Sequence, residues 1–106
     1  MRYSIWRPRT SWGLMPNENH HRASDRIQVE LIEADVDIAF GLVDDALEEF
    51  RDGNAPFARR ALEDAEKVLV DIEERLAHLE AERRAPFGPL VDELRKSIRA
   101  AESECA

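Results

Sequence analysis

The sequence has few of the residues that cross-link a chain or interrupt its regular structure. Its 106 residues include one cysteine, four glycines and five prolines. Cys105 alone cannot form an intrachain disulfide, which excludes a secreted disulfide scaffold. No apolar run approaches the ~20 residues that cross a bilayer, and the N-terminus lacks the uninterrupted apolar core of a signal peptide. We therefore expect a cytoplasmic protein that contacts no membrane.

Aromatic residues are also scarce, whereas charge is abundant and mostly negative. Aromatics make up 7% of the chain and charged residues 36%, with a net charge of −8. Residues 27–106 carry ten Lys and Arg against twenty-one Asp and Glu, a net charge of −11, whereas residues 1–26 carry +3. An acidic domain repels nucleic acid phosphates. We therefore expect no nucleic acid partner.

Two apolar ladders with alternating spacings of three and four residues dominate the chain. The first consists of Val29, Ile32, Val36, Ala39, Val43, Ala46 and Phe50, and the second of Ala58, Leu62, Ala65, Leu69, Ile72, Leu76 and Leu79. Such spacing places apolar side chains on one side of a helix, where they pack against another helix. The sequence therefore predicts an all-α domain dominated by a long antiparallel helical hairpin, with helices over 24–51 and 55–84.

Glycine and proline mark the ends of these helices. Gly53 suits the left-handed position after a helix, and Asn54 can cap the next one. The second helix is stopped by Pro86, Gly88 and Pro89. A shorter third helix is predicted over 89–103, because proline is favoured as the first residue of a helix. The result is a three-helix arrangement in which the third helix covers only part of the first.

Residues 1–23 show no apolar period, so we predict a flexible N-terminal tail followed by a helical bundle domain over 24–106. Both tryptophans, Trp6 and Trp12, lie in this tail among arginines. Exposed tryptophan beside arginine is a common anchor composition, which leaves docking on the bundle or on a partner open. Met15 offers an alternative start, which would leave residues 1–14 outside the native chain.

The apolar arc of the first helix, roughly 200° wide, is broader than one partner helix can cover. Leu31, Ile38 and Leu42 flank its ladder on one side. Because the third helix is short, we expect part of this arc to be exposed in a monomer, and exposed apolar patches mark interfaces. We therefore predict a homodimer, with these three residues and the two tryptophans as candidate interface. The alternative is a monomer whose N-terminal segment fills the gap.

Few polar residues suggest chemistry. His78 has Glu74 and Glu82 four residues to either side, which could form a row of ligands on one helix face; we interpret it as an interfacial histidine and expect no metal site. Asp35 lies inside the apolar arc and needs a cationic partner, for which Arg60, Lys67, Arg75 and Lys96 are the candidates. Three further acids recur every seven residues and are expected to be solvated: Glu66, Glu73 and Glu80.

Two short resemblances to known families bear on function. Glu30-x-x-Glu33 and Glu49-x-x-Asp52 resemble the acidic pairs with which all-helical nucleotide pyrophosphohydrolases of the MazG type hold magnesium. That resemblance implies a metal-dependent enzyme, but here both pairs fall on one predicted helix.

The other resemblance is to the tetratricopeptide repeat, at Gly53, Ala58, Leu62 and Ala65, where small residues allow two helices to pack closely. From the whole sequence we expect a small, acidic, non-catalytic protein–protein interaction or assembly module. We expect no cofactor, and no residue names the protein partner. A pyrophosphohydrolase-like enzyme is the alternative.

Overall fold

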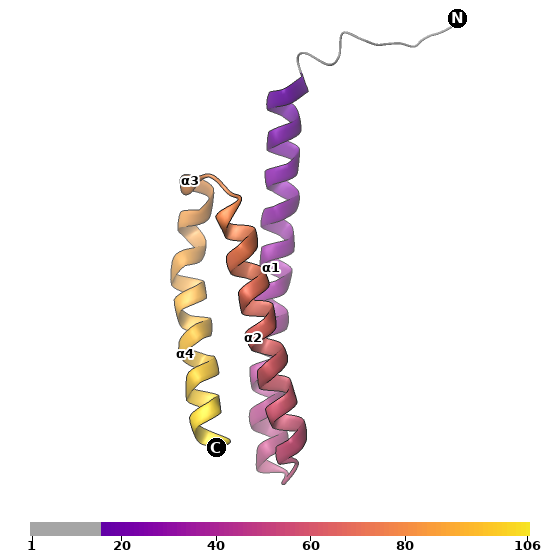
Figure 1. Cartoon of the computed structure of the whole chain (residues 1–106), viewed down its shortest axis with the longest axis vertical. Helices are drawn as coiled ribbons and strands as arrows, with labels where there is room; N and C mark the ends of the chain where they lie inside the picture. The colour runs from indigo at the N-terminus through magenta and orange to yellow at the C-terminus, as the bar shows by residue number, and fades with distance from the viewer. Residues whose placement is uncertain (1–15) are drawn as a thin grey trace, which may run out of the picture.

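The computed structural model describes the backbone of residues 16–106 and the side chains from Ser24 onward. This part of the chain is all-α and contains no strand. Its elements are α1 (Pro16–Arg51), α2 (Ala55–Ala77), the single-turn α3 (Ala81–Arg84), a 3-10 turn (Ala85–Phe87) and α4 (Gly88–Glu104). Figure 1 shows α1 and α2 running antiparallel with α4 alongside. The predicted all-α fold, a long hairpin with a shorter third helix, is confirmed.

The turn between α1 and α2 follows the predicted glycine and cap chemistry. Gly53 has φ +90°, in the region that favours glycine. The Asn54 side-chain oxygen accepts a hydrogen bond from the Phe57 backbone N–H at 3.4 Å, and its amide donates to Glu49 at 3.1 Å. These bonds satisfy a free amide of the first turn of α2 and hold the end of α1 against it.

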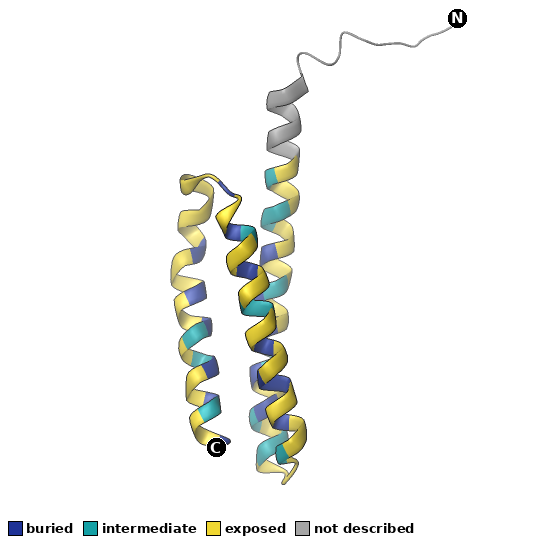
Figure 2. Ribbon diagram, viewed as in Figure 1, coloured by how far each residue is buried: buried dark blue, intermediate teal, exposed yellow. Residues whose placement is uncertain are grey.

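The core lies along the sides of the helices that face one another (Figure 2). Ile32, Ile72 and Leu94, from α1, α2 and α4 respectively, are its largest fully buried side chains. The α1–α2 interface contains small, fully buried residues, whose size allows the two helices to approach closely. These residues are Ala39, Ala46, Ala58 and Ala65. The first and last members of the α1 ladder, Val29 and Phe50, are only half-buried and pack at its margins.

Two helix boundaries differ from the prediction. α1 begins at Pro16 rather than near residue 24, and proline is tolerated there because the first helical residue has no intrahelical partner for its N–H. The prediction of a flexible tail over 1–23 falls mostly outside the described residues, and the domain boundary at residue 24 stays a prediction.

The second difference is at α2, which ends at Ala77 rather than Arg84 although neither glycine nor proline lies nearby. Instead the chain bends so that Leu79 and Phe87, 4% and 6% exposed, close the end of the core. Arg83 on α3 then pairs with Asp25 on α1, with Nε–Oδ2 at 3.7 Å. Burial of two large apolar side chains, each worth about 1.5–3 kcal/mol, outweighs the local helix propensity of the segment.

The three long helices differ in length more than the sequence predicted. α1 has 36 residues, α2 has 23 and α4 has 17, which correspond to about 54, 35 and 26 Å. The N-terminal end of α1 therefore extends past the turn that joins α2 to α4 (Figure 1).

Candidate interaction surfaces

One line of exposed apolar side chains runs along α1. Ile27, Leu31 and Ile38 are 55%, 39% and 53% exposed, and Ala34 between them is also exposed. Their spacings of four, three and four residues place all four on one side of the helix. We call these four residues the α1 stripe. The other large exposed apolar residues of the described part do not form such a line, since Phe57 and Val70 are 13 positions apart on α2 and Leu90 is on α4.

The structure separates the predicted interface residues into three groups. Leu31 and Ile38 are exposed, as an interface between molecules requires. Leu42 is half-buried and packs against the core, so it contributes only its outer surface. Trp6 and Trp12 lie outside the described residues. Ile27 was not predicted, although its position four residues before Leu31 is the sequence signal that identifies it.

A polar cluster borders the α1 stripe. Asp35 is paired with Arg75 of α2, with Arg75 Nε and Asp35 Oδ2 3.5 Å apart, and Arg75 Nη1 donates to Gln28 Oε1 at 3.2 Å. The Asp35 side chain is 24% exposed and that of Arg75 is 36% exposed. Among the predicted cationic partners, Arg75 is therefore the one that compensates the carboxylate in the apolar arc.

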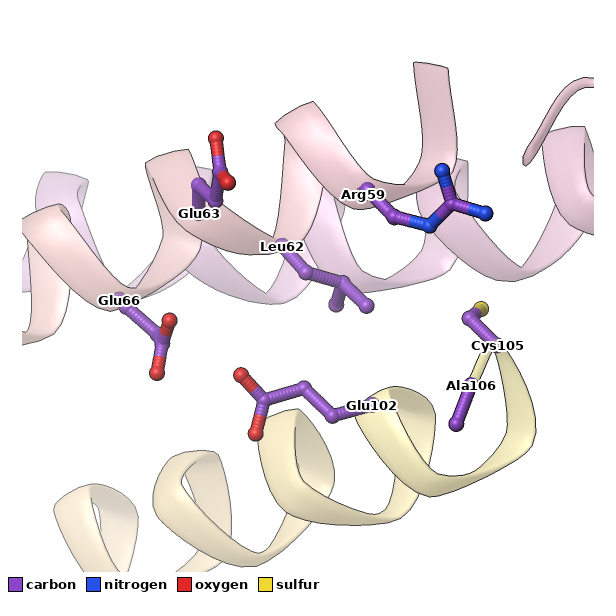
Figure 3. Close-up of a pocket in the computed structure, with 7 residues that line it drawn as sticks. All are labelled: Arg59, Leu62, Glu63, Glu66, Glu102, Cys105 and Ala106. Atoms are coloured by element: carbon purple, nitrogen blue, oxygen red, sulfur yellow. The ribbon is translucent and has the colours of Figure 1, made fainter. Parts of the chain in front are cut away.

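A shallow hollow of about 280 Å³ lies between the first half of α2 and the end of α4 (Figure 3). The carboxyl groups of Glu66 on α2 and Glu102 on α4 point toward each other across it. Partial desolvation beside α4 raises the pKa of Glu66, although Glu66 is an exposed residue, and a hydrogen bond to Glu102 and the negative charge of Glu102 raise it further. The buried Cys105 thiol also lines this hollow. Protonation of Glu66 is therefore favoured relative to that of an isolated carboxyl group.

The three acids of the seven-residue repeat thus differ from the expectation of a uniformly solvated row. All three are exposed, but Glu66 faces Glu102, and Glu73 pairs with Arg95 of α4, which also contacts Asp92 at 3.1 Å. Glu80 lies outside α2, directly before α3. Sequence periodicity placed these acids on one face but could not show that α4 would approach it.

The remaining polar candidates do not converge. His78 directly follows the last residue of α2 and is exposed, and Glu82 belongs to α3, so the two do not continue a row with Glu74. Within the described residues no three His, Cys, Asp or Glu side chains are grouped to hold a metal ion.

The acidic pairs of the pyrophosphohydrolase resemblance are equally separate. Glu30 and Glu33 are exposed on α1, Glu49 is engaged with Asn54, and Asp52 lies just beyond the helix end. The structure therefore does not bring Glu49 and Asp52 to face Glu30 and Glu33.

No protein-family model, curated protein or solved structure matches this chain. Over the described residues, none of the helices combines the length and apolarity needed to cross a membrane.

Proposed function

We propose that the protein is a non-catalytic helical assembly module that forms a homodimer through the α1 stripe. The observation that carries this proposal is the line of Ile27, Leu31 and Ile38, which stays exposed while the other apolar residues of the arc are buried or half-buried against α2 and α4. A helix with an uncovered apolar line gains free energy by packing it against another helix. Two copies of one chain supply identical stripes that can pair about a two-fold axis.

The exposed apolar area of the α1 stripe determines how strongly two copies are expected to associate. Complete burial of one such side chain is worth about 1.5–3 kcal/mol, and roughly half of each remains exposed. Six half-exposed side chains across a two-fold interface therefore supply about 6 kcal/mol. Association costs about 4–15 kcal/mol of lost translational and rotational freedom. This gain offsets at most the lower part of the cost of association, so the stripe suits a weak dimer that dissociates at about millimolar concentrations or above. The outer surface of Leu42 adds to the contact.

Sedimentation equilibrium of the full chain tests this proposal. We expect the weight-average mass to rise above the monomer's 12.2 kDa as the protein concentration approaches about 1 mM. Ile38→Asp should return the mass to that of the monomer, because it places a carboxylate in the interface. Val70→Asp is the matched control, since Val70 is 52% exposed, almost as much as Ile38, but lies on α2. A monomeric wild type, or equal dissociation by both variants, would contradict the proposal.

A further inference from the structure

A second surface lies on another side of α1, where α4 approaches it. An open hollow of about 490 Å³ is lined by two carboxylates and three apolar side chains: Glu33, Val36, Asp37, Phe40 and Leu90. Phe40 is half-buried and packs against the core, while Leu90 is 43% exposed. The lining thus offers an apolar floor with negative charge at its edge and no basic side chain.

The row of carboxylates continues along α1, where the lining also includes one basic side chain. A second hollow of about 280 Å³ is lined by Asp44, Leu47, Glu48 and Arg51. We call the two hollows together the acidic groove. With 3.6 residues per turn, its residues lie roughly 120° around α1 from the α1 stripe. The groove is therefore separate from the proposed dimer surface, and the inference below does not depend on that dimer.

Residues 1–15 have the complementary composition. This segment contains three arginines and no acidic residue, and it holds both tryptophans of the chain: Arg2, Trp6, Arg7, Arg9 and Trp12. Tryptophan and arginine are the side chains most enriched at the energetic centres of protein interfaces. We propose that residues 1–15 bind the acidic groove of the same chain, with an arginine beside Glu33 and Asp37 and an aromatic ring on Phe40 and Leu90.

Chain length decides which tryptophan can reach the groove. Glu33 is 17 residues from Pro16 on α1, about 26 Å along the helix axis. An extended chain covers at most 3.3–3.6 Å per residue, so Trp6, ten residues before Pro16, can extend about 35 Å. That length passes Glu33 and just meets the level of Phe40, which is 24 residues and about 36 Å from Pro16 along α1. Trp12, four residues before Pro16, extends only about 14 Å and cannot reach it. Binding within one chain therefore uses Trp6 as the anchor.

Tryptophan fluorescence of the full chain tests this inference, because every tryptophan of the protein lies in the segment. Acrylamide quenching and the emission maximum are measured for Trp6→Phe and Trp12→Phe, with a synthetic peptide of residues 1–15 as the fully exposed reference. We expect Trp6 in Trp12→Phe to be shielded and blue-shifted, and Trp12 in Trp6→Phe to match the peptide. Two tryptophans that both match the peptide would overturn the proposal.

The groove is tested with Glu33→Lys plus Asp37→Lys in the Trp12→Phe background. Quenching of Trp6 should rise to the peptide value, and 1 M salt should have the same effect on the unmodified groove, because it shortens the screening length to about 3 Å. Asp71→Lys plus Glu74→Lys on α2 makes the same change in net charge and should leave Trp6 shielded. An equal loss of shielding in this control would overturn the assignment to the groove. Shielding that disappears on dilution would place the segment on a second copy and overturn binding within one chain.

Discussion

Removal of the Asp35–Arg75 ion pair should lower the free energy of unfolding by more than the loss of an exposed ion pair does and by less than the loss of a buried one. Exposed pairs contribute about 0.2–1 kcal/mol, whereas removing one partner of a fully buried pair costs about 3–5 kcal/mol. Here the two side chains are 24% and 36% exposed. We therefore expect Arg75→Met to lower the free energy of unfolding by about 1.5 kcal/mol, which corresponds to a melting temperature lower by roughly 6–12 °C.

The geometry also predicts an order among the variants. Arg75→Met loses both the contact to Asp35 and the hydrogen bond to Gln28, and it leaves a carboxylate in the apolar arc. Asp35→Asn leaves the guanidinium bonded to Gln28 and should cost less. The double variant should be more stable than the sum of the single changes predicts, because neither charge is then left without its partner.

Urea denaturation of the wild type, the two single variants and the double variant measures this coupling directly. We expect a coupling free energy of about 1 kcal/mol that changes little between low and moderate salt, because the pair is mostly shielded from solvent. A coupling below about 0.3 kcal/mol, the usual scatter of independent sites, would refute the reasoning.

Four other predictions follow from single features of the structure. Ile72→Ala should lower the free energy of unfolding by about 2–5 kcal/mol in urea denaturation, because Ile72 is fully buried and the change leaves a cavity. Gly53→Ala should cost about 1–2 kcal/mol in the same assay, through its φ of +90° alone, because no atom lies within 4 Å of an added Cβ. Because the pKa of Glu66 is raised in the folded state, protonation of Glu66 stabilises the fold fully below the ordinary pKa of 4.5, and this stabilisation is lost as the pH rises through the raised pKa. Glu66→Gln removes the ionised form, so it should stabilise the fold by about 0.5 kcal/mol at pH 7 and have no effect near pH 4. Thermal melts at the two pH values check this expectation. Calorimetric titration with magnesium and a non-hydrolysable nucleoside triphosphate should show no saturable binding; micromolar binding lost in Glu30→Gln would instead favour the pyrophosphohydrolase-like alternative.

The sequence was sufficient to predict three helices, the buried side of each and the turn between the first two, because the signals for these features are local. Alternating spacings of three and four residues fix which side of each helix is buried, and Gly53 with Asn54 fixes where the chain reverses. The sequence reduced the partner of Asp35 to four candidate Lys and Arg residues but could not choose among them. Helix periodicity predicts the face on which a residue lies, but not its position along a neighbouring helix. Arg75 became the partner only when the antiparallel register placed it opposite Asp35.

The end of α2 could not be predicted in the same way. Residues 78–84 contain good helix formers and no breaker, so local propensity favours a helix through Arg84. The bend instead depends on contacts with distant residues, since Leu79 closes the core together with Phe87, and Arg83 pairs with Asp25. The contacts between acidic residues of α2 and side chains of α4 were not predicted for the same reason. Glu66 and Glu102 are 36 positions apart, and only the packing of α4 on α2 makes them neighbours.

The distribution of apolar residues around α1 explains why this helix carries both proposed surfaces. A helix that packed against α2 alone would need one narrow line of apolar residues, whereas α1 also contacts α4 and has further apolar residues on the side of Ile38. Because only two helices pack against α1, they cannot surround it, and one side of α1 remains exposed as the α1 stripe. The contact between α1 and α4 is shallow, so a hollow remains open at Phe40. Because these two surfaces lie on different sides of one rigid helix, a charge change at Asp37 should leave the mass of the dimer unchanged. Likewise, Ile38→Asp should leave Trp6 shielded.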